Sequence, residues 1–569
     1  MNYAAGGLDP RGYRAVNLGI HILCGLLVFG IIRRSFSSLR TSSNPSNLSD
    51  PSNLLAFFCA LIWLLHPLES EVVDYVTQRT ESLMALMYLT TLYGFIRGVG
   101  SERPWRWYSV SVVSCWLGMM CKESMVTAPL MVLLYDVVFC AGSVAKALRR
   151  RTMLYAGLAA STVLLAVLVS SNGRSHSAGF SSGVSAWTYL LNQAPMVLRY
   201  LRLAVWPTSL VFDYGLPKAT TLSTVLPAAL PILALVTVTA AAWFIDRRLA
   251  YLGTWVFITL APTSTFVPIA TEVGAERRMY LPMIAIVVLV VLAFRAVLGQ
   301  RAILAGSLAA VSILFGVLTF DRNRDYHDPI ALWRQVISRY PHGRAHYNLG
   351  VHLRDAGQRT EAIREFELSL GDTPDGEYAL GFEALNDRRY EEAIARLRRY
   401  LEREPLDINA IRASNLLGRS LLEAGRPDEA AAAFRETLRM HHDDVDAIGG
   451  LGQALLNGGH VEDALPVLDR YAQRLPQNVG AHFNLGLAYM KLRRFEEAYA
   501  ELSRASALNP RDPAPHANLG TTLAELGRFD EAIDQFRQAA AVESDATAQQ
   551  EIRGIIEQLD IEKKRAGHQ

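Results

Sequence analysis

The chain has 569 residues, more than one ordinary soluble domain holds, and its charge is divided unevenly along its length. Residues 1–320 contain 13 acidic and 24 basic residues in an apolar background, whereas residues 321–569 contain 41 acidic and 32 basic residues. This asymmetry excludes a single soluble globular domain and indicates two parts that fold in different solvents. All five cysteines precede residue 141, so a disulfide framework is not expected. The polar opening MNYAAGGLDPRGYR does not resemble a cleavable signal peptide.

Ten apolar segments of the first part predict membrane-spanning helices, since a span needs about 20 mostly apolar residues. They centre on residues 15–32, 52–66, 82–96, 106–121, 125–141, 153–171, 222–245, 249–269, 280–295 and 302–319. A further apolar stretch, 184–206, contains Asn192, Gln193, Pro195 and two arginines. We expect this stretch to lie at the membrane interface or to dip into it without crossing.

Basic residues cluster after every second predicted span. The clusters are Arg33/Arg34/Arg40, Arg97/Arg103/Arg106, Lys146/Arg149/Arg150/Arg151, Arg247/Arg248 and Arg295/Arg301. Short loops rich in Lys and Arg tend to stay in the cytoplasm, so ten spans place all five clusters there. The opposite side then carries the N-terminus, the loops 67–81 and 270–279, the segment 172–221 and everything after residue 320.

A period of 34 residues marks the second part of the chain. Gly418, Gly452, Gly486 and Gly520 are each 34 apart, and an alanine follows each glycine by twelve residues. Two less regular units fit the same offset at Gly350/Ala362 and Gly381/Ala393, and prolines fall 24 after the glycine in four units. This pattern is the signature of tetratricopeptide (TPR) repeats, in which small residues let two antiparallel helices pack closely. We expect six repeats that stack into a right-handed superhelix with a concave binding groove.

The sequence therefore predicts an all-α protein: a polytopic membrane helix bundle followed by a TPR solenoid. The expected boundaries are 1–320 for a multi-pass transmembrane domain, 321–342 for a linker, 343–546 for six TPR repeats, and 547–569 for a capping helix and tail.

Charged residues that a membrane protein places at the ends of its spans are candidates for function. The loop HPLESEVVDYVTQRTESL contains His66, Glu69, Glu71, Asp74, Arg79 and Glu81. If this loop is helical, Glu71 and Asp74 are neighbours at spacing i,i+3, and the patch could hold a divalent cation or orient a sugar hydroxyl. The alternative is a solvated loop with internal salt bridges.

Two more polar groups are predicted on the same side. Lys122 and Glu123 separate two apolar helices, where the lysine could pair with a lipid phosphate or simply reach the interface as a snorkelling turn residue. The segment TEVGAERRMYLP brings together Glu276, Arg277, Arg278 and Tyr280, and arginine presents a planar fork that suits phosphate. Asp213 and Tyr214, in FDYGLP, are weaker candidates. The sequence contains no Walker loop, dinucleotide fingerprint, GxSxG or HExxH motif.

Five segments in order resemble the membrane region of the transmembrane and TPR repeat-containing proteins, a family of protein O-mannosyltransferases. They are GYRAVNLGIHIL, HPLESEVVDYVTQRTESL, CKESMVTAPLMVLLYD, VWPTSLVFDYG and AERRMYLP. The resemblance implies a C-type glycosyltransferase fold that takes a sugar, mannose or a similar one, from a polyprenyl-phosphate carrier. It also implies an extracytoplasmic acceptor protein in the TPR groove, modified on Ser or Thr, and no nucleic-acid partner.

The resemblance assigns roles to particular residues. Glu71, Arg79 and Glu81 match the pattern after HP, Lys122 and Glu123 match a KE pair, and Glu276, Arg277 and Tyr280 match an ER…Y segment. We expect Arg79, Lys122, Arg277, Arg278 and Tyr280 to bind the donor or its phosphate. Glu71, Glu81 and Glu123 are the candidate catalytic acids. No cofactor is assigned, although a divalent cation is compatible with the acidic loop.

One feature departs from that fold. Its enzymes place an essential acidic residue in the first external loop, where a carboxylate can act as general base. Here Asp9 is the only acid before the first predicted span. We therefore expect the base to lie upstream of Met1, as though the first membrane helix were missing, or the protein to be a catalytically impaired relative.

Two alternatives to a lipid-linked sugar transferase stay open. The first is a non-catalytic membrane scaffold whose TPR array recruits envelope proteins, which a missing base favours. The second is an oligosaccharide ligase of the O-antigen type, which also combines membrane helices with TPR repeats. Compact loops and sparse glycosylation sequons favour the bacterial inner membrane, with the repeats on the periplasmic side.

Overall fold

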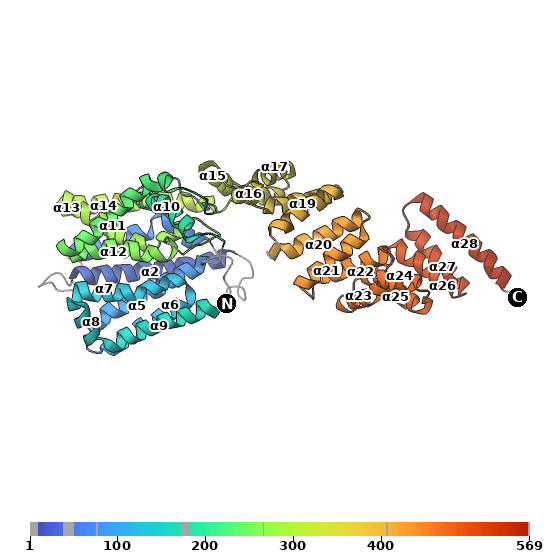
Figure 1. The fold of residues 1–569 in the computed structure, drawn as a ribbon, viewed down its shortest axis with the longest axis horizontal. Coiled ribbons are helices and arrows are strands. Elements are labelled where there is room, and N and C mark those ends of the chain that lie inside the picture. The colour runs from blue at the N-terminus through green and yellow to red at the C-terminus, as the bar shows by residue number, and fades with distance from the viewer. Residues whose placement is uncertain are drawn as a thin grey trace. The chain divides into compact units, whose positions relative to one another are not determined.

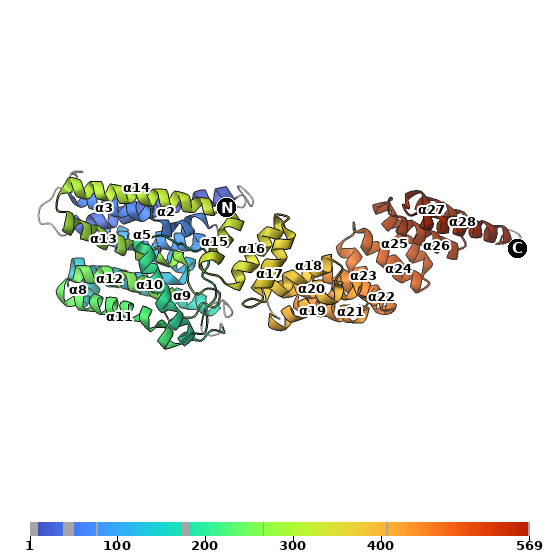
Figure 2. The same cartoon turned by 90° about the horizontal axis from the view of Figure 1, so that it is seen from above.

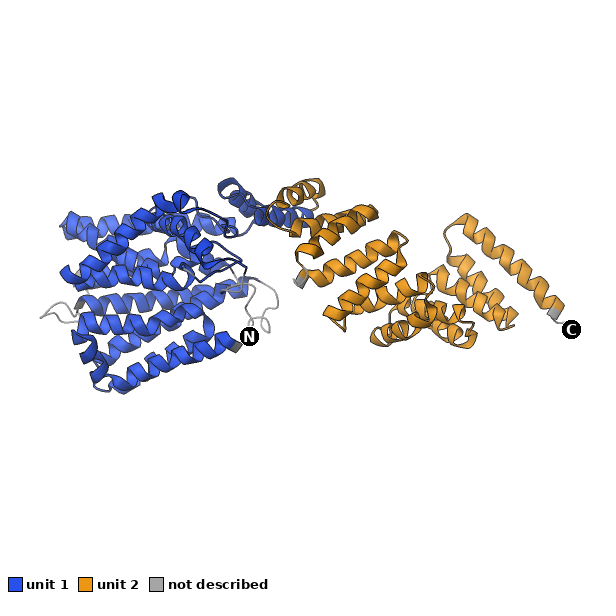
Figure 3. Ribbon diagram, in the orientation of Figure 1, with its two compact units in different colours: residues 1–356 blue, residues 357–569 orange. Residues whose placement is uncertain are grey.

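A computed structural model gives the arrangement of residues 10–37, 51–75, 78–171, 179, 183–265, 267–404 and 408–566. Asp9, considered above, lies outside the described residues. The predicted all-α class is confirmed, and the chain divides into two compact units, residues 1–356 and 357–569 (Figure 3). Each unit is described separately.

Each of the ten predicted apolar segments of unit 1 forms helix. They correspond to α2 (Pro10–Ser37), α3 (Pro51–Leu64), α5 (Arg79–Val99), α6 (Pro104–Cys121), α7 (Ala128–Asp136), α9 (Thr152–Ser171), α11 (Leu222–Ile245), α12 (Arg247–Leu260), α13 (Pro282–Leu298) and α14 (Arg301–Asp325). Short helices join them: η1 (Pro67–Glu69), α4 (Ser70–Asp74), η3 (Glu123–Thr127), η4 (Val137–Ala141), α8 (Val144–Arg150), η5 (Ala261–Thr263) and η6 (Glu276–Met279). Proline occupies the first turn of several of them, where its missing N–H costs no helical hydrogen bond.

The helices of unit 1 run roughly parallel to one another (Figures 1 and 2). α2 packs on α3 and α5, α6 on α5 and α9, and α13 on α3 and α12. Within the described residues, six helices are long and apolar enough to cross a membrane, or seven if the bent pair Ser52–Leu64 and Pro67–Asp74 is one span. The larger number, ten, therefore stays a prediction, because α6 is not among these helices and α3, α12 and α13 are shorter than a full span.

The outer surface of these helices is apolar, which a water-soluble bundle would not tolerate. Phe244 is 93% exposed, Ile245 86% and Met153 87%. α11 as a whole is almost entirely unburied along its length. Hydrophobic surface on this scale needs a hydrocarbon solvent, so unit 1 is a multi-pass membrane bundle.

The segment 184–206 forms α10 (Ala186–Val205), which is amphipathic. Its inner face buries Tyr189, Gln193 and Tyr200, while Trp187 and Arg202 are exposed. Ser185 caps its N-terminus by accepting a hydrogen bond from the Thr188 N–H. The helix packs on α11 and leads into the loop that carries Asp213 and Tyr214.

The segment 321–342 contains the last turn of α14 and α15 (Pro329–Arg339), and α15 packs on α16 (Gly343–Asp355). Both helices belong to unit 1. The remaining helices are α17 (Arg359–Ser369), α18 (Asp375–Asn386), α19 (Tyr390–Arg403), α20 (Ile408–Glu423), α21 (Pro427–Met440), α22 (Val445–Asn457), α23 (Val461–Arg474), α24 (Val479–Lys491), α25 (Phe495–Leu508), α26 (Pro513–Glu525), α27 (Phe529–Val542) and α28 (Ala546–Ala566).

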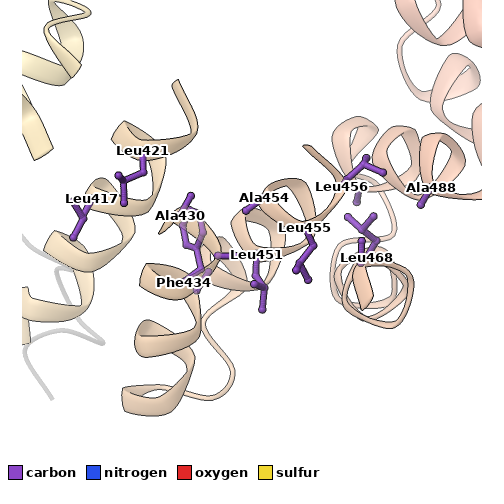
Figure 4. Close-up of a cluster of buried hydrophobic side chains, with 14 of the residues drawn as sticks. Leu417, Leu421, Ala430, Phe434, Leu451, Ala454, Leu455, Leu456, Leu468 and Ala488 are labelled. Atoms are coloured by element: carbon purple, nitrogen blue, oxygen red, sulfur yellow. The ribbon is translucent and has the colours of Figure 1, made fainter. Parts of the chain in front are cut away.

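The repeat period of the sequence has a direct packing cause in unit 2. A Cβ added at Gly452 would lie 2.5 Å from Leu468, and one added at Gly486 would lie 2.7 Å from Leu502, sixteen residues further on in both cases. Neighbouring pairs share one continuous core, part of which is shown in Figure 4. The small residue therefore lets the two helices of each repeat approach, as the sequence predicts.

Candidate active site

The charged residues of unit 1 collect at two opposite ends of its helices. α5 runs from Arg79 to Val99 and so separates the two groups. At its C-terminal end, a cavity of about 760 Å³ is lined by four of the arginines predicted to face the cytoplasm: Arg34, Arg97, Arg103 and Arg106. The candidate site residues lie at the other end, where α4, α5, η6 and the end of α14 meet.

Side-chain hydrogen bonds join the elements at this second end. The Asn17 amide donates to the carbonyl oxygen of Val73 at 3.2 Å and accepts from Nε of Arg79 at 3.3 Å. Nη2 of Arg14 donates to the carbonyl oxygen of Tyr326 at 3.4 Å. The first turns of α2 and α5 and the end of α14 are therefore held together, although they are far apart in sequence. Arg79 is engaged in this contact and is half-buried.

Glu71 and Arg277 form the central ion pair of the site. Oε1 of Glu71 accepts from Nη1 of Arg277 at 2.5 Å, and Oε2 accepts from the Arg277 backbone N–H at 2.8 Å. The Glu71 side chain is 1% exposed and that of Arg277 is 14% exposed. Arg277 also forms an ion pair with Glu272. Two residues predicted for different roles, a catalytic acid and a phosphate ligand, are thus partners of each other.

Arg278 is buried more deeply than its neighbour. Its Nη2 donates to Oε1 of Glu272 at 2.9 Å, and its Nη1 donates to the carbonyl oxygen of Thr263 at 2.8 Å and to the Tyr189 hydroxyl at 3.1 Å. Burial by itself raises the pKa of Glu272, but the charges of Arg278 and Arg277 outweigh burial and lower that pKa below its ordinary value. Glu272 therefore stays ionised and neutralises both arginines.

Lys122 and Glu81 form a second ion pair, which ties the end of α6 to the first turn of α5. The Glu81 side chain is 7% exposed, whereas that of Lys122 is 22% exposed and can reach solvent or a headgroup. Glu123 begins η3 next to this pair and is half-buried.

Tyr280 turns away from the ion pairs and into the helix core. Its hydroxyl shares a 2.7 Å hydrogen bond with Nδ1 of His21, and its carbonyl oxygen accepts from Nε1 of Trp63 at 3.1 Å. The tyrosine is 1% exposed. This contact fixes the start of α13 against α2 and α3, and the predicted role of Tyr280 in binding the donor stays a prediction.

Several buried polar atoms at this end have no hydrogen-bond partner within the described part of the protein. They are both carboxylate oxygens of Glu69, Oε2 of Glu276, Nε of Arg278, Nε and Nη2 of Arg322, and the hydroxyl of Tyr326. Such atoms are costly unless water or a ligand satisfies them. At this end of the bundle, water or a ligand can therefore supply the hydrogen bonds that the protein does not.

Glu276 links the site to the loop that follows α10. Its Oε1 accepts from the Val211 N–H at 2.5 Å and from the Tyr214 hydroxyl at 3.0 Å. Burial, assisted by the negative charge of Glu71, raises the pKa of Glu276 to about 7. A carboxyl group with such a pKa can exchange a proton near neutral pH, which is the property required of a general acid or base.

Glu71 and Asp74 of the acidic loop, which the sequence predicts as neighbours on one helix face, have different partners in the structure. Glu71 is occupied by Arg277, whereas Asp74 approaches the side-chain amide of Asn323 at 2.7 Å. Among the described residues, no group of three or more His, Cys, Asp or Glu side chains has the geometry of a metal site. The role of a divalent cation stays a prediction.

Glu272 and Arg322 were not predicted from the sequence, whereas Glu69 was predicted only as a member of the acidic loop. Glu272 lies in the quoted segment TEVGAERRMYLP, but its pairing with two arginines depends on a turn that the sequence does not reveal. Arg322 lies in the last turn of α14, just beyond the apolar segment 302–319, and this position was the available signal. The weaker candidate Asp213 accepts hydrogen bonds from Arg344 of α16 at 2.5 and 2.7 Å, so it fastens α16 to the loop after α10.

These features define a class: a multi-pass membrane protein that carries tetratricopeptide repeats and has a buried charged cluster at one end of its membrane helices. Models of the tetratricopeptide repeat match residues 317–377, 415–479, 459–517 and 489–554. Solved TPR structures are similar to part of the chain. MamA from Desulfovibrio magneticus RS-1 is 22% identical and covers 30% of this chain and 94% of its own, with a TM-score of 0.28.

The family resemblance is confirmed by similarity to curated proteins. The human protein O-mannosyl-transferase TMTC4 is 25% identical over 422 residues, 64% of this chain and 55% of its own length. The protein O-mannosyl-transferase Tmtc1 of Drosophila melanogaster is 24% identical over 481 residues, 66% of this chain and 53% of its own. The chain spans about half the length of these relatives.

Proposed function

We propose that the protein is a membrane glycosyltransferase that moves a sugar, mannose or a similar one, from a polyprenyl-phosphate carrier to Ser or Thr of an extracytoplasmic protein. The observation that carries this proposal is the buried network of Glu71, Arg277, Glu272 and Arg278 in a chain similar to proteins named O-mannosyl-transferases. A simple membrane anchor has no need of four charged side chains in a largely buried setting.

The reaction requires one base and a positive environment for the leaving group. The acceptor hydroxyl oxygen attacks C1 of the sugar, the bond from C1 to the phosphate oxygen breaks, and the electron pair leaves with the phosphate. The acceptor proton passes to a carboxylate, for which Glu71, Glu81 and Glu123 are the candidates among the predicted residues. Arg277 and Lys122 have partly exposed side chains that can turn toward the departing phosphate.

The ion pairs of the site restrict how its cationic side chains could bind a phosphate. Lys122, Arg277 and Arg278 each contact a carboxylate, so a phosphate would have to replace that carboxylate or join it. Arg79 has no carboxylate partner among the described residues and remains a further proposed phosphate ligand.

The TPR unit is the proposed site for the acceptor or for a partner protein, since such repeats bind proteins. Within unit 1, the Asp213–Arg344 ion pair fastens α16, the first helix of the predicted repeats, to the loop after α10. We place the charged end of the bundle on the extracytoplasmic side, and the protein in the bacterial inner membrane with its repeats in the periplasm.

A reconstituted transfer assay tests the proposal. The purified full chain in lipid nanodiscs is given polyprenyl-phosphate mannose with a radiolabelled sugar and a Ser/Thr-containing acceptor protein. We expect label on the acceptor, and a loss of about 100-fold in rate for Arg277→Gln, the usual size of effect when one transition-state donor is removed. Arg149→Gln, on the exposed helix α8, is the matched control.

A non-catalytic scaffold is the second candidate, and one observation favours it. The cationic side chains predicted to bind phosphate are largely neutralised by Glu71, Glu81 and Glu272, as they would be in a purely structural network. Absence of transfer, together with repeat-dependent capture of an envelope protein, would establish the scaffold. Transfer of a preassembled glycan in place of a single sugar would instead indicate a ligase.

A further inference from the structure

An apolar groove runs along the membrane surface between α13 and α14. It has a volume of about 450 Å³, and its walls include Val290, Phe294, Val311 and Leu314. The residues from Ile286 to Phe294 alone cover about 12 Å of helix. The groove thus extends from the charged end of the bundle over roughly a third to a half of a hydrocarbon core about 30 Å thick.

A pocket rich in arginine adjoins this groove at Thr208, in the loop that follows α10. It has a volume of about 230 Å³ and is lined by Arg199 and Arg202 of α10, by Arg339 of α15, and by Leu203, Thr208 and Ser209. Thr208 lines both the pocket and the groove. Trp206, which is 63% exposed, also lines the groove, and exposed tryptophan is enriched at membrane–water interfaces.

The three arginines of this pocket have no acidic partners within the described residues. Arg199 donates to the Tyr214 hydroxyl at 3.2 Å and to the carbonyl oxygen of Ser209 at 2.9 Å, and Arg339 donates to the carbonyl oxygen of Leu210 at 2.7 Å. Burial and the nearby charge of Arg322 lower the pKa of Arg339, and the charges of Asp325 and Glu276 oppose this shift only in part. This pocket differs from the Glu71–Arg277 network, whose cations are neutralised, because it leaves a concentrated positive charge for an external anion.

We propose that the groove and the arginine pocket together bind one lipid with a phosphate headgroup on a long linear run of isoprene units. The chain would lie along α13 and α14, and the phosphate on Arg199, Arg202 and Arg339. The inference rests on the proposed function, because the sugar donor has this chemistry. The positive charge of the pocket favours an anionic ligand. Because the pocket and the groove meet at Thr208, a single molecule with a phosphate and a long apolar chain can fill both.

This location places the headgroup next to the charged cluster. Tyr214 accepts a hydrogen bond from Arg199 and donates one to Glu276, whose pKa is about 7. The Tyr214 hydroxyl therefore connects a phosphate bound to Arg199 with the Glu276 carboxyl group. The pocket arginines would thus hold the carrier phosphate in addition to the residues that the family resemblance assigns, and the sugar would face Glu276 and the Glu71–Arg277 pair.

Binding by the purified full chain in detergent tests the site without any need for transfer. The probes are geranylgeranyl phosphate, the alcohol geranylgeraniol, phosphatidylglycerol and inorganic phosphate, with retention measured by native mass spectrometry. The variants are Arg202→Gln, which removes an exposed arginine with no internal partner, and Val290→Trp, which fills the groove. Arg149→Gln and Ile313→Trp, on an outer face of α14 that does not line the groove, are the matched controls.

We expect geranylgeranyl phosphate to bind, and its Kd to rise about tenfold in Arg202→Gln, the usual size of one lost charge-assisted hydrogen bond. Val290→Trp should have an effect at least as large, and the two controls should leave the Kd unchanged. Equal retention of phosphatidylglycerol would show a site for bilayer phospholipid and overturn the proposal. Equal binding of inorganic phosphate, or unchanged binding in both variants, would overturn it as well. Lipid retention without sugar transfer would preserve this site and refute the proposed function alone.

Discussion

Replacement of Glu71 by glutamine should destabilise unit 1, because it leaves Arg277 buried with half of its compensation. The Glu71 carboxylate is 1% exposed and makes two hydrogen bonds to Arg277, at 2.5 and 2.8 Å. Removing one partner of a buried ion pair costs about 3–5 kcal/mol. Since Arg277 keeps its second pair with Glu272, we expect the lower end of this range, about 3 kcal/mol.

A double-mutant cycle separates this effect from general damage. Glu71→Gln, Arg277→Gln and the double variant are compared by thermal unfolding of the purified full chain in detergent. The single variants should lower Tm by about 5 °C, and the double variant should be more stable than the sum of the two by about 2 kcal/mol. Glu102→Gln is the control, because Glu102 is an exposed acid at the opposite end of α5 with no ion pair to any described residue. Additive effects, or a shift no larger than that of Glu102→Gln, would refute the view that the pair organises the site.

The remaining predictions concern pH, repeat packing and repeat turns. Because the pKa of Glu276 is raised to about 7, the folded state between about pH 5 and 7 holds a proton that the unfolded state has released, so the stability of the fold should decrease as pH rises through this range. Glu276→Gln should remove this part of the dependence of Tm on pH. An unchanged pH profile in the variant would contradict the prediction. Gly486→Leu should lower the stability of unit 2, measured by chemical denaturation, by about 1–3 kcal/mol, because a side chain there overlaps Leu502. Gly554→Ala is the control, because open space surrounds Gly554. Equal denaturation midpoints for the two variants would contradict the packing argument. Arg493 has a φ of 56° where Gly459 and Gly527 occupy equivalent turns, so Arg493→Gly should stabilise unit 2 by about 1 kcal/mol in the same measurement, and a loss of stability would contradict this.

The repeat unit could be predicted in some detail because its period is a local packing requirement. The offset from Gly486 to Leu502 recurs between Gly452 and Leu468, so the sequence itself records which positions must be small. The membrane helices could be located for a similar reason, since hydrocarbon demands uninterrupted apolar segments. Their boundaries and their number of crossings depend on bends such as the 51° break between α3 and the segment Pro67–Asp74, which hydropathy does not register.

The candidate site could be predicted as a set of segments but not as a set of contacts. The segments containing Glu71 and Arg277 are 206 residues apart, and nothing in either one indicates that their charges neutralise each other. The same holds for Arg202 and Arg339, which belong to different predicted elements and converge on one pocket. Charged residues near membrane helices indicate that a site exists, whereas their pairing follows from the fold of the whole bundle.

The account depends most directly on which face of the membrane carries the charged cluster and the repeats. In a background without the five native cysteines, Thr80→Cys marks the acidic loop, His442→Cys marks the repeats and Glu102→Cys marks the opposite end of α5. Labelling of intact cells with a membrane-impermeant maleimide should modify the first two positions and should reach the third after permeabilisation. Modification of Glu102→Cys in intact cells, or of Thr80→Cys and His442→Cys from opposite faces, would contradict the proposed transferase and its lipid site.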